Sequence, residues 1–350
     1  MTYIAKPRVH HPALPKNALG LTRRDYEGKI STLCAGCGHD SISAALIQAC
    51  FDLELEPYRI AKLSGIGCSA KTPTYFLGAA HGFNGVHGRM PSLATGANLA
   101  NRDLIYVGIS GDGDTASIGL GQFVHAIRRG VNMLYMVENN GTYGLTKGQF
   151  SATADVGSTS KGGEANLYPP IDLVRLALDM GAGFVARGFS GDKDQLVPLI
   201  RAALSYPGFA YIDCLSPCVT FNNHEGSTKS YAYVREHEFA VADLVPPAEE
   251  ITVSYAPGER KAVTLHDGSQ LLLRKLAEDY DPGDRGAALD LLAAHRNRGE
   301  IPTGLFYLDP VGTDMHAHLH TVETPLNALD FTELCPGNNG ALGKINAALR

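Results

Sequence analysis

The sequence is poor in several features that would assign it to common classes of protein. Its 350 residues include no tryptophan, and only 19% are charged. The 30 Lys and Arg residues are outnumbered by 36 Asp and Glu residues, which gives a net charge of −6. Such a balance offers no general attraction to a phosphate backbone, because nucleic-acid binding needs clustered basic side chains. We therefore expect no nucleic-acid partner.

Long apolar runs are also absent. No stretch is long enough to cross a bilayer, and residues 1–30 are polar and interrupted by prolines, unlike a signal peptide. We therefore expect no membrane partner and a cytoplasmic location. Thiols stay reduced in that compartment, so the grouping of the seven cysteines indicates metal binding or catalysis and not disulfide bonds.

Short β-rich apolar runs alternate with helical patterns along much of the chain. The runs at 59–64, 104–110, 131–138, 184–189 and 209–215 each read as a buried strand, and helical spacing separates them. This alternation is typical of an α/β fold in which helices cover both faces of a parallel sheet.

The texture of the sequence divides the chain into three expected segments. Residues 1–28 read as an N-terminal arm, because the apolar pattern becomes regular only afterwards. Residues 29–247 form the main domain. The pattern changes again after two consecutive prolines, and residues 248–350 contain a hairpin-like stretch and helices but no chemical motif. We interpret this last segment as an α+β appendage that packs against another subunit.

Polar residues follow two of the expected strands, an acidic glycine-rich turn after the first and an asparagine after the second. Gly111-Asp112-Gly113-Asp114 comes directly after the run 104–110, and Asn140 comes just after the run 131–138. A right-handed βαβ crossover would bring both loops to the carboxyl edge of the sheet, although Asp112 and Asn140 are 140 − 112 = 28 positions apart. Carboxylate and amide oxygens suit magnesium, which keeps sites for phosphate oxygens. The pattern predicts a magnesium–diphosphate site; the alternative is two ordinary turns.

Four of the cysteines stand next to expected strand or helix ends. Cys34 and Cys37 precede a helix, whereas Cys68 and Cys218 each follow a strand. Loops at one sheet edge could bring these thiols together, around either a [4Fe–4S] cluster or a structural zinc ion. The spacing favours the cluster but leaves zinc open. The remaining cysteines read as inert apolar residues, namely Cys50, Cys214 and Cys335.

These motifs resemble those of one family. The stretch GDGDTASIGLGQFVHAIRRGVNMLYMVENNGTYGLTKGQ resembles the 2-oxoacid:ferredoxin oxidoreductase branch of the thiamine-diphosphate enzymes. The segments CAGCGH, GIGCS and SPCVTFN are similar to the segments that hold an iron–sulfur cluster in that family, and they occur in the same order. The resemblance covers roughly residues 30–230. It implies a thiamine-diphosphate-binding fold with three cofactors, thiamine diphosphate, Mg2+ and one [4Fe–4S] cluster.

The resemblance also implies roles for individual residues. Magnesium would be held by the side chains of Asp112 and Asn140 and by the carbonyl of Thr142, and the cluster by Cys34, Cys37, Cys68 and Cys218. The residues implied around thiamine diphosphate are Gly67, Cys68, Ser69, His87, Gly88, Arg89, Gly111, Asp112, Gly113, Asp114, Asn140, Gly144 and Leu145. Lys71 and Lys147 correspond to lysines associated with coenzyme A, and Leu145 to a position that influences the choice of substrate.

The activity implied by the resemblance is the CoA-dependent oxidative decarboxylation of a 2-oxoacid to an acyl-CoA and CO2, with single electrons passing to ferredoxin. The stretch YGLTKGQFS favours 2-oxoglutarate, with a pyruvate-specific enzyme as the alternative. Thiamine activation normally needs a carboxylate from a second, related domain. The sequence holds no second copy of the fold, so we expect a beta subunit that works with a separate alpha subunit and a separate ferredoxin.

Two further alternatives stay open from the sequence. A non-redox thiamine-diphosphate decarboxylase or carboligase would use the same magnesium motif, with zinc or nothing on the cysteines. In a non-catalytic metal-binding interaction subunit, Asp112 and Asn140 would be ordinary turn residues.

Overall fold

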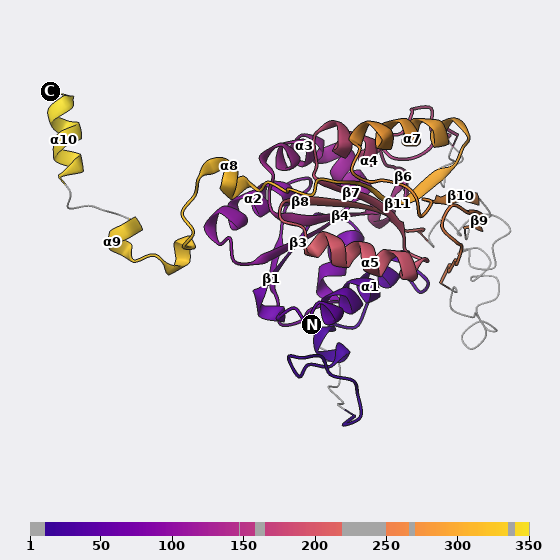
Figure 1. Cartoon of the computed structure of the whole chain (residues 1–350), viewed down its shortest axis with the longest axis horizontal. Helices are drawn as coiled ribbons and strands as arrows, with labels where there is room; N and C mark the ends of the chain where they lie inside the picture. Colours follow the sequence, from indigo (N-terminus) through magenta and orange to yellow (C-terminus); the bar gives the residue numbers. More distant parts are fainter. Residues whose placement is uncertain are drawn as a thin grey trace.

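A large sheet lies at the centre of the protein (Figure 1). The computed structural model describes residues 11–146, 148–157, 165–218, 250–265, 270–334 and 340–349. Within them nine strands lie in the order β2-β1-β3-β4-β8-β7-β11-β10-β9, and those from β2 to β7 run parallel. The strands are β1 (Ile60–Ser64), β2 (His81–Asn84), β3 (Ile105–Gly111), β4 (Met133–Asn139), β7 (Phe184–Phe189), β8 (Phe209–Leu215), β9 (Arg260–Thr264), β10 (Gln270–Lys275) and β11 (Ile301–Leu308).

Helices cover both faces of this sheet, which confirms the α/β class and the layering expected from the sequence. One apolar layer joins α2, α3, α4 and α7 to the sheet, and α1 and α5 pack on the opposite face. Successive strand residues point to opposite sides, so Tyr106 of β3 enters the first layer and Val107 the second. The helices are α1 (Gly38–Asp52), α2 (Met90–Ala100), α3 (Leu120–Arg129), α4 (Leu173–Asp179), α5 (Lys193–Leu204), α7 (Arg285–Asn297), α8 (Met315–Leu319), α9 (Phe331–Leu334) and α10 (Ala341–Ala348).

Local sequence signals set several helix ends. The side chain of Asp172 caps α4 by accepting hydrogen bonds from the amides of Val174 and Arg175. Gly130 ends α3 in the left-handed conformation, with φ of 64°, which glycine adopts without a steric penalty. The stretch between β3 and β4 is divided into a π turn at Asp114–Ile118 and then α3. Single π turns are frequent at functional sites.

The parallel strands bring loops from distant parts of the chain to one edge. Ser64 at the end of β1 pairs with Ile109 of β3, and Gly111 pairs with Glu138 of β4. Asn139 in turn pairs with Leu215, the last residue of β8. The segments that follow these four strands therefore leave the sheet side by side, at the edge where open α/β sheets bind ligands.

The C-terminal part extends the same sheet. Strand β11 pairs antiparallel with β7, and β10 and β9 continue outward from it. A small core of Phe189, Tyr255, Val263 and Leu273 joins the two parts. The hairpin-like stretch of the sequence is thus an edge of the main sheet, and the expected boundary at residue 248 stays a prediction.

The two ends of the described chain differ. Tyr26 is fully buried and its ring meets the ring of Phe51 edge-on, with centroids 5.9 Å apart, so part of the expected N-terminal arm packs on α1.

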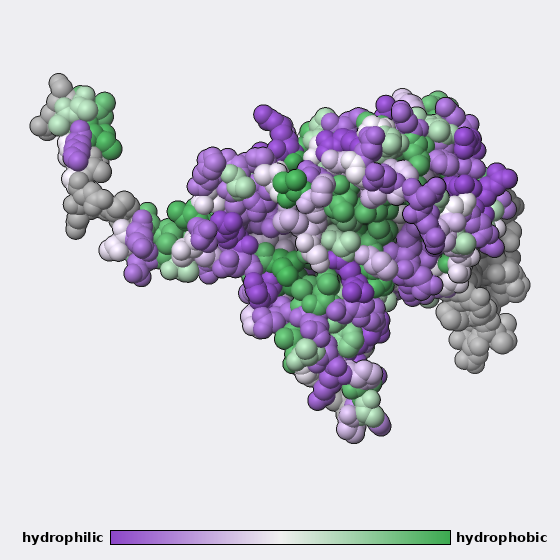
Figure 2. All heavy atoms as spheres, viewed as in Figure 1, coloured by the Kyte–Doolittle hydropathy of each residue, from purple (hydrophilic) through white to green (hydrophobic). Residues whose placement is uncertain are grey.

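At the other end, α8 to α10 lead away from the sheet (Figure 1), and apolar side chains are exposed on α10 (Figure 2). Among the described residues, none of the helices has both the length and the apolar character needed to span a bilayer.

Candidate functional site

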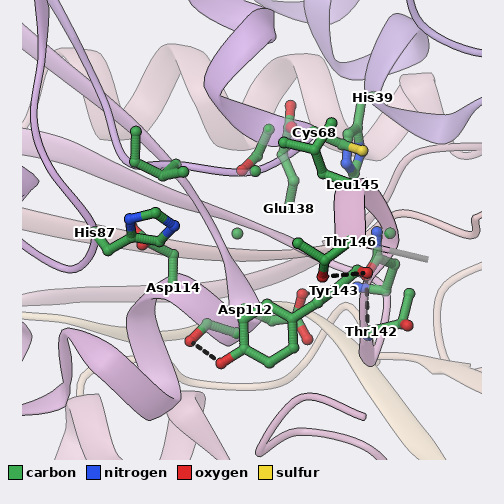
Figure 3. Close-up of a pocket in the computed structure, with 17 residues that line it drawn as sticks. His39, Cys68, His87, Asp112, Asp114, Glu138, Thr142, Tyr143, Leu145 and Thr146 are labelled. Carbon is green, nitrogen blue, oxygen red and sulfur yellow. Dashed lines mark hydrogen bonds and ion pairs between the residues drawn. The ribbon is translucent and has the colours of Figure 1, made fainter. Parts of the chain in front are cut away.

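A pocket with about 500 Å³ of open space lies at the carboxyl edge of β1, β3 and β4 (Figure 3). Loops after these strands and the hairpin of β5 (Thr142–Tyr143) and β6 (Gln149–Phe150) form its walls. Its lining residues are His39, Ile66, Gly67, Cys68, Ser69, His87, Gly111, Asp112, Gly113, Asp114, Glu138, Asn140, Thr142, Tyr143, Gly144, Leu145 and Thr146. Most of the residues singled out from the sequence therefore face one cavity.

Asp112 lies in the wall of this pocket with its carboxyl group buried. Its Oδ2 accepts hydrogen bonds from the hydroxyls of Ser151 and Thr153, the latter over 2.5 Å. Its Oδ1 accepts a long bond of 3.4 Å from the amide of Asn140. Burial raises the pKa of this carboxyl, whereas the hydrogen bonds favour its ionised form. Burial deprives the ionised carboxylate of its hydration, and a cation bound in the pocket would stabilise that charge instead.

Asn140 and Thr142 complete the group of oxygen atoms beside Asp112. Oδ1 of Asn140 accepts a hydrogen bond of 3.1 Å from the amide of Thr142, and the Thr142 hydroxyl donates to the carbonyl of Gln149 over 2.9 Å. The hairpin thus fixes the loop that carries both residues. Among the described residues, no group of three or more His, Cys, Asp or Glu side chains is arranged to hold a metal ion, so an ion beside Asp112 would also need amide and carbonyl oxygens.

Glycines in the turn after β3 let neighbouring side chains of the pocket wall pack closely on the backbone. A Cβ on Gly113 would lie 2.5 Å from the ring of Tyr143, whose hydroxyl donates to the Gly113 carbonyl over 3.0 Å. A Cβ on Gly111 would come within 3.0 Å of Oγ of Ser69. Any larger residue at these positions would displace the pocket wall, so the closeness of the backbone explains the glycines.

The hydroxyl of Ser69 is the clearest sign that the pocket binds something. Ser69 is 2% exposed, and its Oγ has no hydrogen-bond partner among the residues that the structure describes. A buried hydroxyl without a partner costs free energy, about 1 to 3 kcal/mol. Because this residue lines the pocket, a polar ligand atom there would satisfy it.

Thiols gather at the same end of the pocket. A Cβ built on Gly144 would lie 3.5 Å from Sγ of Cys68 and 3.6 Å from Sγ of Cys218, so the two sulfurs flank this glycine. Burial raises the pKa of the Cys68 thiol, and the neighbouring thiols of Cys218 and Cys34 raise it further. Cys37 also lies within electrostatic reach of Cys218. Cysteines from three separate loops therefore share one neighbourhood.

The loop after β8 and the start of α1 are joined directly, which explains this neighbourhood. The amide of Gly38 donates to the carbonyl of Pro217, 3.4 Å away, and the amide of Cys37 donates to the carbonyl of Cys34, 3.0 Å away. The first link holds the residue before Cys218 against the helix N-terminus that follows Cys37.

Two buried titratable groups between the thiols and Asp112 were missed in the sequence. Glu138 is fully buried, and the Thr72 hydroxyl approaches both of its oxygens, at 2.9 and 3.0 Å. Nδ1 of His39 lies 3.5 Å from Glu138 Oε2 and 2.5 Å from Oγ of Ser216. Burial raises the pKa of Glu138 well above its usual value and lowers that of His39 to about 4. The available signal was a single carboxylate in an otherwise apolar strand, VNMLYMVE.

Several residues singled out from the sequence do not line the pocket. Gly88 contacts a residue of the pocket wall, since its amide donates to Oδ1 of Asp114 over 2.9 Å. Arg89 lies at the N-cap of α2, and Lys71 lies in the 3-10 turn after Cys68. Lys147 and Cys335 fall outside the described residues. Cys50 and Cys214 are buried in α1 and β8, as expected for apolar residues.

Comparison with known proteins agrees with this geometry. The family model for the thiamine pyrophosphate enzyme C-terminal TPP binding domain matches residues 65–214. The 2-oxoacid:ferredoxin oxidoreductase subunit beta of Saccharolobus solfataricus is 42% identical over 199 residues, which are 57% of this chain and 65% of that protein. The 2-oxoglutarate synthase subunit KorB of Methanocaldococcus jannaschii is 34% identical over 189 residues, 54% of this chain and 69% of that protein.

A solved structure extends the likeness to nearly the whole chain. It is the 2-oxoglutarate:ferredoxin oxidoreductase from Magnetococcus marinus with 2-oxoglutarate, coenzyme A and succinyl-CoA bound, with a TM-score of 0.69 and 30% identity over 94% of this chain and 96% of that one. The match to the Saccharolobus protein spans a little under two thirds of that relative's length. Taken with the pocket that Asp112, Asn140 and Cys68 share, these matches show that the chain belongs to the family of 2-oxoacid:ferredoxin oxidoreductase beta subunits.

Proposed function

We propose that this chain is the cofactor-carrying beta subunit of an enzyme that converts a 2-oxoacid and CoA into an acyl-CoA and CO2, with electrons passing to ferredoxin. One observation carries the proposal. Oxygen atoms suited to magnesium, from Asp112 and Asn140, share a pocket with the thiol of Cys68, and the thiol of Cys218 lies on the other side of the pocket residue Gly144. A non-redox thiamine enzyme has no need for thiols beside its cofactor.

Thiamine diphosphate and Mg2+ fit the residues of the pocket. The side chains of Asp112 and Asn140 and the carbonyl of Thr142 would hold the ion, whereas the bare backbone of Gly111 and Gly113 would accept the diphosphate. The unpartnered hydroxyl of Ser69 would donate to the same ligand. When bound, thiamine diphosphate supplies an electron sink for decarboxylation. The protein holds the ligand at the sheet edge and keeps His39 and Glu138 buried beside it.

The four thiols are our candidates for holding a [4Fe–4S] cluster. They come from three separate loops; Cys68 lies within electrostatic reach of Cys34 and Cys218, and Cys37 lies within reach of Cys218. Such a cluster accepts electrons one at a time, which links decarboxylation to ferredoxin and not to simple protonation. Burial raises the pKa of the Cys68 thiol, so the positive charge of bound iron would be needed to keep it ionised.

We favour 2-oxoglutarate as the substrate and coenzyme A as the acyl acceptor. The Methanocaldococcus relative is named for 2-oxoglutarate, and the solved Magnetococcus enzyme contains 2-oxoglutarate, coenzyme A and succinyl-CoA. Leu145 lines the pocket and is 54% exposed, which places it at the entrance, where it would contact the substrate. Lys71 and Lys147 stay our candidates for binding CoA.

The proposed reaction needs two further proteins. A separate alpha subunit would supply the carboxylate that activates the aminopyrimidine ring of thiamine, and a ferredoxin would accept the electrons. We also propose a cytoplasmic location, where reduced thiols can hold a cluster.

An anaerobic assay tests the proposal. The chain, co-purified with its alpha subunit, is mixed with CoA and a one-electron dye, and dye reduction with 2-oxoglutarate is compared with that for pyruvate. We expect CoA-dependent reduction with 2-oxoglutarate, its loss in Asp112→Ala, and no change in Asp290→Ala, which alters an exposed carboxylate on α7. Release of CO2 without dye reduction would contradict the redox function, and preference for pyruvate would contradict the substrate.

A further inference from the structure

A buried ion pair lies behind the wall of the pocket. Nε of Arg187, on β7, donates to Oδ2 of Asp213, on β8, over 2.9 Å. Its Nη2 donates to Asp172 at the start of α4 over 3.0 Å. Arg187 is 8% exposed and Asp213 is 1% exposed. An arginine is always charged in proteins, so the carboxyl group of the buried Asp213 lies against a permanent positive charge.

The other oxygen of this carboxylate fixes an amide next to the pocket. Oδ1 of Asp213 accepts a hydrogen bond of 3.0 Å from Nδ2 of Asn139, the last residue of β4. The reversed amide would turn its own oxygen toward a carboxylate, which is unfavourable. Asp213 therefore directs Oδ1 of Asn139 toward Thr153, whose hydroxyl lies 3.2 Å away.

Thr153 connects this amide to Asp112. Its hydroxyl has one proton, and two oxygens accept it, Oδ1 of Asn139 at 3.2 Å and Oδ2 of Asp112 at 2.5 Å. The hydroxyl of Ser151 lies 2.7 Å from Oγ1 of Thr153 and also contacts Asp112 Oδ2. Both hydroxyls hold the same carboxylate oxygen. Among the residues that the structure describes, the second oxygen, Oδ1, accepts a single long bond, from the amide of Asn140, which leaves it accessible to a ligand.

We infer that Asp213, Asn139 and Thr153 form a positioning relay, anchored by Arg187, that orients the carboxylate of Asp112 for a divalent cation. The inference rests on the proposed magnesium site. None of the relay residues lines the pocket, and their effect on a bound cation would pass through the hydrogen bond from Thr153 to Asp112. Partners behind a metal ligand typically change metal affinity by about 10-fold to 100-fold when they are removed.

Cation affinity tests the relay directly. Mn2+ binding is measured by electron paramagnetic resonance in the complex of this chain with its alpha subunit, at saturating thiamine diphosphate. Thr153→Val removes the hydroxyl but keeps the shape of the side chain, and Thr153→Ser restores the hydroxyl. We expect Mn2+ affinity to fall by about 10-fold to 100-fold in Thr153→Val and to stay within about 3-fold of the wild type in Thr153→Ser.

Two variants of the ion pair separate the relay from general damage. Asp213→Asn should weaken Mn2+ binding in the same direction, because it no longer fixes the amide of Asn139. Asp172→Asn is the matched control, since it removes the other charge beside Arg187 while asparagine still caps α4. Its Mn2+ affinity should be unchanged.

The outcomes that overturn the relay differ from those that overturn the function. Wild-type affinity in Thr153→Val, or an equal loss in Asp172→Asn, would overturn the relay and leave the magnesium site standing. Wild-type Mn2+ affinity in Asp112→Ala would overturn the magnesium site and the relay together.

Discussion

The backbone amide of Gly88 donates a hydrogen bond to Oδ1 of Asp114, 2.9 Å away. This bond ties the loop after β2 to the turn after β3, and Oδ2 of the same carboxylate accepts a bond of 3.1 Å from Ser110. Gly88 has a φ of 68°, and a Cβ there would lie 2.6 Å from the amide nitrogen of Gly119. The position of His87 in the pocket wall therefore depends on a glycine next to it.

Replacing this glycine should damage both the fold and the pocket. We expect Gly88→Ala to lower the free energy of unfolding by about 2 to 4 kcal/mol, from the left-handed backbone and the clash with Gly119 together. Urea unfolding measures this loss. Gly96→Ala is the matched control, because Gly96 lies in α2 with open space around it, and alanine there should stabilise by about 0.5 to 1 kcal/mol. Equal stability of the two variants would show that Gly88 is not constrained.

The cysteines should divide into two groups by iron content. Serine at Cys34, Cys68 or Cys218 removes one proposed cluster ligand, so anaerobically purified protein should lose most of its iron, sulfide and brown colour. Cys50→Ala changes a buried thiol on α1 and should keep them. Metal analysis of each purified variant checks this division. Stoichiometric zinc in the wild type, or iron loss in Cys50→Ala, would contradict the cluster assignment.

Lys62 should make stability depend on pH in the alkaline range. Its ammonium group is buried on β1 and donates to the carbonyls of Pro73, Phe76 and Leu77 over 2.6 to 2.9 Å. Burial lowers its pKa to about 8, below its usual value of 10.5. Between these values the unfolded chain binds more protons than the folded one, so stability should rise with pH.

The size of this rise follows from the shift. Relative to Lys62→Met, the wild type should gain on the order of 3 kcal/mol in free energy of unfolding between about pH 8 and pH 10.5. Parallel urea titrations of the two proteins at several pH values measure the difference, and a Cys50→Ala background removes the thiol whose pKa is coupled to the charge of Lys62. Parallel pH profiles would rule out a lowered pKa for Lys62.

The hydroxyl of Thr72 should contribute to the stability of the fold. It donates to the buried carboxyl group of Glu138, so Thr72→Val should lower the free energy of unfolding by about 1 to 3 kcal/mol. Thr95→Val offers a control of the same chemistry, since the Thr95 hydroxyl bonds only to the Pro91 carbonyl within α2. That change should have an effect below about 0.5 kcal/mol. Thermal or urea unfolding of the pair decides whether Glu138 depends on Thr72.

The central part of the fold could be predicted because its signals are local. The apolar runs of β3, β4, β7 and β8 appear within one or two residues of their expected bounds. Strand β2 was missed because all four of its residues, His81–Asn84, are exposed and show no alternation. The extension of the sheet by β9 to β11 was missed because pairing between β11 and β7 joins residues more than a hundred positions apart. No local pattern encodes such a partner.

In the candidate site too, some features could be predicted from local sequence signals and others arise only from tertiary contacts. Asp112 and Asn140 could be expected to meet because parallel strands deliver their following loops to one edge. Glu138 was missed because a lone carboxyl group in a buried strand reads as part of the core. Ser151 and Thr153 lie in a loop with no motif, and only the folded backbone shows that their hydroxyls reach Asp112. Sequence pattern indicates which residues carry the chemistry, whereas the contacts that hold them arise from tertiary packing.

The most direct measurement is calorimetric titration of thiamine diphosphate into the complex of this chain with its alpha subunit, with and without Mg2+. We expect binding that needs Mg2+ in the wild type and in Asp290→Ala, and a loss of at least about 100-fold in affinity in Asp112→Ala. Binding of equal strength in Asp112→Ala, or binding indifferent to Mg2+, would contradict a magnesium-held thiamine diphosphate at the carboxyl edge of β3 and β4.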